Sequence, residues 1–207
     1  MKFTPLYIAI FLIWLFHISG MIGILMGHEQ LFIALTPINL LVCLGAILWI
    51  EKWQAKRLLL LLIPFSIGMF AEILGVNYGY FFGEYAYGKN LGPKFLGVPW
   101  FIGVNWAILT YCSANIARRL TNNLFLSSLT GAALMVGLDF VIEISAPRFD
   151  FWEFKNGIIP LQNYLAWFGF GFVANFLFQK FSPPGNTILA YNIMLAFSFF
   201  FLIFVFF

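Results

Sequence analysis

The sequence predicts an all-α fold: a polytopic membrane bundle of about seven transmembrane helices with two partly re-entrant outer loops, in one domain over residues 1–207. Hydrophobic residues make up 62% of the chain and charged residues only 9%, whereas a soluble domain carries about 25% charged residues. Apolar runs of about 20 residues, the length that crosses a bilayer, recur along the whole chain. No basic patch lies outside the loops, so nucleic acid is not an expected partner.

Seven apolar segments are long enough to span a membrane. We predict transmembrane helices at 6–27, 31–50, 58–75, 100–117, 124–146, 161–180 and 187–206. The third contains Pro64, which a membrane helix tolerates. The apolar run that follows Lys2 is too long for a secretory signal peptide, and no small-residue cleavage site follows it, so we expect a retained first helix.

The positions of lysine and arginine predict the orientation, because cytoplasmic loops carry an excess of positive charge. One side of the bundle collects most of these residues, namely Lys2, Lys52, Lys56, Arg57, Arg118, Arg119 and Lys180. The other side has Lys89, Lys94, Arg148 and Lys155. We therefore expect a multi-pass protein of the cell membrane with its N-terminus in the cytoplasm and its C-terminus outside.

Two long connections, 76–99 and 147–160, both fall on the predicted outer side. They are rich in glycine, proline and aromatic residues, as in the run from Gly79 to Gly83. They are too apolar for solvated loops, and irregular backbone at membrane depth is tolerated only against protein or a cavity. We expect both connections to fold back over, or re-enter, the outer half of the bundle.

Three carboxylic acids, Glu72, Asp139 and Glu143, interrupt the apolar spans. An ionisable side chain near a bilayer centre costs about 2.5–3.5 kcal/mol on insertion scales, so its presence calls for a reason. At a rise of about 1.5 Å per residue, all three lie within about two turns of the predicted outer helix ends. The spacing of four residues places Asp139 and Glu143 on one helix face.

Polar and aromatic residues of two further helices belong to the same predicted layer. Asn105 and Trp106 lie about one turn from the outer start of the fourth span, and Asn163 and Trp167 hold the same place in the sixth. Simpler roles remain open, since tryptophans also form interfacial belts. The sequence nevertheless places polar groups from four helices in the outer third of the membrane.

Ordinary structural roles also remain open for several polar residues. A buried acid can be a hydrogen-bond partner, and Glu143 is close enough to the outer end to reach Arg148 or the interface. We interpret His17 as a packing histidine of the first helix. Three asparagines are expected to form helix–helix hydrogen bonds: Asn39, Asn175 and Asn192.

A layer of buried acids suits general acid–base catalysis. Burial disfavours the ionised form of a carboxyl group, so two close acids tend to share one proton. The neutral acid can donate a proton while its partner orients or deprotonates water, and aromatic faces can stabilise a developing cation. The chain has neither the Cys/His spacing of a metal site nor a nucleotide-binding glycine motif. We expect neither a metal nor a nucleotide cofactor.

Three groups of residues resemble the integral-membrane carotenoid biosynthesis proteins, which include the carotenoid 1,2-hydratases and bisanhydrobacterioruberin hydratases. The resemblance covers about 70–180. Its motifs are Glu72-x-x-Gly75 with Gly79-x-x-Phe82-Gly83-x-Tyr85-x-Tyr87, Leu91-Gly92-Pro93-Lys94 and Val98-Pro99-Trp100 up to Trp106, then Asp139-x-x-x-Glu143-x-x-Ala146-x-Arg148 with Trp152, and last Gly157-Ile158-Ile159-Pro160-Leu161-Gln162-Asn163 with Trp167.

The resemblance implies a cofactor-free hydro-lyase that adds water across the terminal C1=C2 double bond of an acyclic carotenoid such as lycopene, γ-carotene or bisanhydrobacterioruberin. The expected partners are this substrate, the lipid bilayer and other carotenoid biosynthesis enzymes. Within the resemblance, the expected site comprises Asp139 as proton donor, Glu72 and Glu143 to tune it or to position water, Asn105 and Asn163 as ligands of water or hydroxyl, and Tyr85, Trp106 and Trp167 as lining.

Three alternative functions remain open from the sequence. A carotenoid end-group cyclase or isomerase would begin with the same protonation and differ in what captures the cation. A proton-coupled transporter would need a polar track across the membrane, whereas the buried acids are confined to the outer half. A non-catalytic scaffold for carotenoid enzymes would tolerate neutralisation of all three acids.

Overall fold

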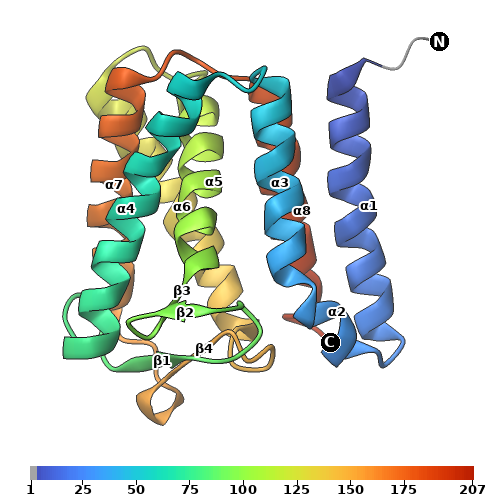
Figure 1. Cartoon of the computed structure of the whole chain (residues 1–207). Coiled ribbons are helices and arrows are strands. Elements are labelled where there is room, and N and C mark those ends of the chain that lie inside the picture. The colour runs from blue at the N-terminus through green and yellow to red at the C-terminus, as the bar shows by residue number, and fades with distance from the viewer. Residues whose placement is uncertain (1–3) are drawn as a thin grey trace.

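The computed structural model describes residues 4–207 as an upright bundle of long helices whose directions alternate (Figure 1). Lys2, one of the residues used to predict the orientation, lies outside the described residues. The α-helices are α1 (Pro5–Leu25), α2 (Glu29–Ala34), α3 (Thr36–Ile50), α4 (Ala55–Tyr78), α5 (Trp100–Ala117), α6 (Leu124–Ser145), α7 (Leu161–Phe181) and α8 (Thr187–Ile203).

The long helices follow the predicted spans closely, with one exception. The predicted helix 31–50 is wrong at its start, because α2 is a separate short helix and α3 begins at Thr36. Pro37 lies in the first turn of α3, where a missing backbone N–H breaks no helical hydrogen bond. Helix α4 extends beyond the predicted end at residue 75 and reaches Tyr78. Gly79 caps it with a left-handed φ of 67°.

Membrane crossing is supported for part of the bundle. Among the described residues, α1, α4 and α6 are long and apolar enough to cross a bilayer, and α3 and α8 are apolar but shorter. The chain is therefore a mostly helical protein with three candidate membrane-spanning helices. A bundle in which all seven long helices cross stays a prediction, as does the orientation.

The two long connections meet at one end of the bundle, which we call the ribbon end (Figure 1). Strand β1 (Tyr85–Tyr87) pairs antiparallel with β4 (Trp152–Phe154), and β2 (Lys94–Phe95) pairs with β3 (Val98–Pro99). A 3-10 turn, η1 (Lys155–Gly157), follows β4. The prediction of a purely α fold misses these short strands. The connections cover this end of the bundle, while their entry into the membrane stays a prediction.

Close backbone approach joins the two connections. A Cβ atom at Gly88 would lie 2.1 Å from the carbonyl oxygen of Asp150, so only glycine fits there. The Gly88 N–H donates to the Phe151 carbonyl at 2.9 Å, and the Lys89 N–H donates to the Asp150 carboxylate at 3.0 Å. These contacts hold β1 against β4 and fix which side chains face the bundle.

Helix α5 lies at the centre of the bundle and packs against α3, α4, α6, α7 and α8. The predicted helix–helix hydrogen bonds are confirmed. Asn39 bonds to His17 between α3 and α1 at 3.2 Å, and Trp14 of α1 donates to Asn192 of α8 at 2.9 Å. Asn175 of α7 accepts from Ser113 of α5 at 3.2 Å.

Candidate active site

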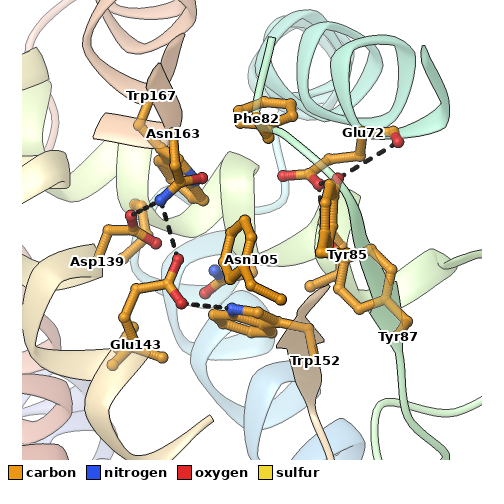
Figure 2. Close-up of a pocket in the computed structure, with 14 residues that line it drawn as sticks. Glu72, Phe82, Tyr85, Tyr87, Asn105, Asp139, Glu143, Trp152, Asn163 and Trp167 are labelled. Carbon is orange, nitrogen blue, oxygen red and sulfur yellow. Dashed lines mark hydrogen bonds between the residues drawn. The ribbon is translucent and has the colours of Figure 1, made fainter. Parts of the chain in front are cut away.

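The three buried acids meet in one cavity just beneath the ribbon end (Figure 2). Glu72 comes from α4, and Asp139 and Glu143 come from α6; each is 3% exposed or less. The cavity wall includes most of the residues expected from the sequence: Glu72, Tyr85, Asn105, Asp139, Glu143, Asn163 and Trp167. The remaining one, Trp106, lies behind the wall.

Glu72 accepts hydrogen bonds from three aromatic side chains. The hydroxyls of Tyr85 and Tyr87 donate to its Oε2 at 2.5 and 2.7 Å, and the Trp106 indole donates to its Oε1 at 3.3 Å. Residues two apart on a strand point to the same side, so β1 directs both tyrosines at Glu72. These bonds tie the ribbon to α4 and α5.

The two tyrosines stay neutral hydrogen-bond donors over a wide pH range. Burial, and then the neighbouring Glu72 charge, raise the pKa of Tyr85 and of Tyr87 above the ordinary tyrosine value. Tyr87 is a residue that the sequence did not single out beyond its motif. Its position two residues after Tyr85 is the signal that could have identified it.

Asp139 and Glu143 share one amide on α7. The side-chain NH2 of Asn163 donates to Glu143 Oε1 at 3.0 Å and more weakly to Asp139 Oδ2 at 3.5 Å. The Trp152 indole of β4 donates to Glu143 Oε2 at 2.8 Å. The two carboxyl groups on one helix face are thereby held side by side, as the four-residue spacing predicts.

Glu143 does not pair with Arg148, an alternative that the sequence left open. Arg148 forms a salt bridge of 2.9 Å with Glu29 instead, because the turn before α2 brings Glu29 to the ribbon end. Within residues 4–207, Glu143 bonds only to neutral donors, Trp152 and Asn163. The sequence singled out Trp152 only as part of a motif, and the structure makes it a direct hydrogen-bond partner of Glu143.

A stacked pair of tryptophans lies at one side of the cavity, with Trp167 in its wall. The rings of Trp106 and Trp167 stack at 4.4 Å between centroids with an angle of 16°. Gly68 of α4 makes room for this stack, because a Cβ there would lie 2.3 Å from the Trp106 ring. Phe82, Trp152 and Phe154 complete an aromatic lining around the acids.

Asn105 stands apart from both clusters of hydrogen bonds. It lies between the Glu72 group and the Asp139–Glu143 pair and forms no hydrogen bond with the other side chains drawn in Figure 2. An amide offers two N–H donors and an acceptor oxygen. Asn105 therefore has donors and an acceptor available to a small polar molecule in the cavity.

The acids differ in how fully their oxygens are occupied. Glu72 accepts from three donors and Glu143 from two, whereas Asp139 has one contact of 3.5 Å. A carboxyl oxygen that is not already paired can carry a proton and present it to a ligand. The arrangement suits proton transfer from Asp139 into an aromatic-lined cavity.

Comparison with known proteins agrees with the resemblance seen in the motifs. A family model described as carotenoid biosynthesis protein matches residues 28–207. The bisanhydrobacterioruberin hydratase of Haloarcula japonica is 32% identical over 134 residues, which cover 61% of this chain and 45% of that protein. The chain thus spans less than half the length of this relative. No solved structure matches the chain. The chain belongs to the carotenoid biosynthesis protein family.

Proposed function

We propose that this protein is a membrane-bound carotenoid hydratase that adds water across the terminal C1=C2 double bond of an acyclic end group. The observation that carries the proposal is the buried Asp139, with an unpaired oxygen, beside Glu143 in an aromatic-lined cavity. A relative in the same family is named a hydratase. The substrate would be a hydrocarbon such as lycopene, which reaches the cavity from the lipid phase.

In the first step the Asp139 carboxyl proton moves to C2 of the double bond. The π electrons form the new C2–H bond, which leaves a tertiary cation at C1 and a carboxylate on Asp139. The rings of Phe82 and Trp167 line the same cavity, and Trp106 stacks behind Trp167. Their faces stabilise the positive charge.

In the second step a water oxygen forms a bond to C1. Glu143 accepts the proton that this water loses and returns it to Asp139 four residues away, so the acid is restored and the net addition is one water. Asn105 and Asn163 orient the water through their amides. Glu72, saturated by Tyr85, Tyr87 and Trp106, holds the ribbon over the cavity and limits access of bulk water.

The test of this proposal is expression of the full chain in a lycopene-producing bacterium, followed by mass analysis of the carotenoids. Hydration predicts products heavier than lycopene by one or two molecules of water. A new product of unchanged mass would contradict hydration and support an end-group cyclase or isomerase. The assay is repeated with γ-carotene and with bisanhydrobacterioruberin as substrates. Recovery of all three carotenoids without hydration would contradict the proposal altogether.

A further inference from the structure

A second chamber lies beside the acid cavity and shares part of its wall. It is bounded by α1, α3, α5, α6, α8 and β4. Four residues line both spaces, namely Ile102, Asn105, Ile142 and Trp152. Whatever occupies the second chamber is therefore separated from the acids by side chains of a single layer.

The far wall of this chamber carries a histidine whose protonation is defined by its partners. Nδ1 of His17 lies 2.7 Å from the Ile13 carbonyl oxygen, which can only accept, so Nδ1 carries the proton. Burial disfavours the charged imidazolium, and in the neutral ring Nε2 then accepts; it lies 3.2 Å from the Asn39 side-chain NH2. In this form His17 fixes the direction of the Asn39 amide.

This direction leaves an acceptor without a partner. With its NH2 turned to His17, Asn39 directs Oδ1 away, and that atom is buried without a hydrogen-bond partner among residues 4–207. Flipping the amide would place Oδ1 against the lone pair of Nε2. A buried polar atom left in this way points to a bound molecule that donates a hydrogen bond.

The chamber offers polar groups at two levels. Thr36 and Asn39 line it near His17, and the free amide of Asn105 lies in the wall that it shares with the acid cavity. Ordered water needs between two and four polar partners, and these residues provide them. The rest of the wall is apolar, with Leu40, Leu91 and Phe197 among its members.

We propose that the second chamber is a water site, in which Asn39 holds the nucleophilic water and Asn105 passes it to the cation formed beside Asp139. This inference rests on the proposed hydratase function. It assigns water to a place separate from the proton donor, so protonation and water capture depend on different residues. Asn39 is then a positioning residue for the second step alone.

The separation of the two steps can be measured in heavy water. A cation that water fails to capture loses a proton again, and wherever the original C2 hydrogen or a methyl hydrogen leaves, the recovered carotenoid keeps the added deuterium without being hydrated. Membranes that contain the full chain are incubated with lycopene in D2O, and both hydrated product and deuterated lycopene are quantified. Asn39→Leu should lower the hydrated product at least tenfold while deuterium continues to enter the recovered lycopene.

Matched variants separate water supply from general damage. Asn192→Leu removes a comparable helix–helix hydrogen bond, to Trp14, outside the chamber and should keep the parental ratio of alcohol to deuterated lycopene. Leu40→Phe fills the chamber without replacing a polar group and should shift the ratio as Asn39→Leu does. It also serves as the test if Asn39→Leu does not accumulate in the membrane.

The inference is overturned if Asn39→Leu and Leu40→Phe hydrate lycopene with the parental ratio. It is equally overturned if they lose hydration and deuterium uptake together, because the chamber then binds the carotenoid. Failure of the hydratase proposal looks different, since the parental protein itself would then give no alcohol.

Discussion

At the scale of single residues, the three acids owe their different roles to their neighbours. Glu72 accepts from two tyrosines and a tryptophan, and Glu143 accepts from Trp152 and Asn163. Asp139 is equally buried but has only a long contact to the same asparagine. Removing the charge from Glu72 or from Asp139 should therefore have different consequences.

Glu72→Gln should destabilise the fold more than it alters the chemistry. A glutamine side chain replaces one acceptor oxygen by an NH2 group, so it leaves at least one of the three buried donors unpaired, at a cost of about 1–3 kcal/mol. Thermal unfolding in detergent should show a lower midpoint than for Glu84→Gln, which changes an exposed ion pair with Lys155. An unchanged midpoint would show that the three donors contribute nothing to stability.

At the scale of elements, the ribbon formed by β1 and β4 covers the cavity and supplies partners to two acids. Tyr85 and Tyr87 of β1 bond to Glu72, and Trp152 of β4 bonds to Glu143. The strand pair therefore fixes the acids from above while α5 and α7 fix them from the side.

Stability should depend on pH through the ribbon tyrosines. The pKa of Tyr87 is raised by burial and then by Glu72, so the folded state holds the phenolic proton more tightly than the unfolded chain. This stabilisation is complete below about pH 10, the ordinary tyrosine value, and is lost as the pH rises toward the folded-state pKa. The unfolding midpoint of Tyr87→Phe should fall less steeply above pH 10 than that of the parent or of Tyr80→Phe, an exposed ring. Parallel curves would contradict this linkage.

Gly88→Ala should separate the two connections. The new Cβ would lie 2.1 Å from the Asp150 carbonyl oxygen, and the backbone of one connection must move to relieve the clash. We expect loss of hydration activity together with increased proteolysis of the ribbon. Gly45→Ala is the control, since a Cβ there meets nothing within 4 Å and should change neither. Parental activity in Gly88→Ala would show that the ribbon is not needed in this form.

At the scale of the whole molecule, helix positions and the layer of polar groups could be predicted, because each depends on local spacing. Glu72, Asp139, Asn105 and Asn163 each lie near one end of an apolar run, and alternating helix directions bring those ends together. The pairing of β1 with β4 could not be predicted, since three-residue strands in aromatic loops carry no distinctive period. Partners distant in sequence, such as Arg148 with Glu29, were missed for the same reason.

The orientation in the membrane is a prediction for the molecule as a whole, and it rests on the distribution of lysine and arginine. Lys155→Cys at the ribbon end and Lys56→Cys at the start of α4 replace exposed residues, whereas the native Cys43 and Cys112 are buried. In intact cells a membrane-impermeant maleimide should label position 155, and position 56 only after lysis. Labelling in the reverse order would invert the proposed topology.

The central claim is that Asp139 donates the proton that starts hydration, and Asp139→Asn tests it most directly. Asparagine keeps the size of the side chain but cannot deliver a proton, and a general acid contributes about 100-fold or more to a rate. The rates are compared with lycopene as substrate and with equal amounts of each protein in the membrane. Asp139→Asn should hydrate lycopene at least about 100-fold more slowly than the parent. The control, Glu153→Gln, changes an exposed residue of β4 and should match the parent. Hydration by Asp139→Asn at the parental rate would contradict the account.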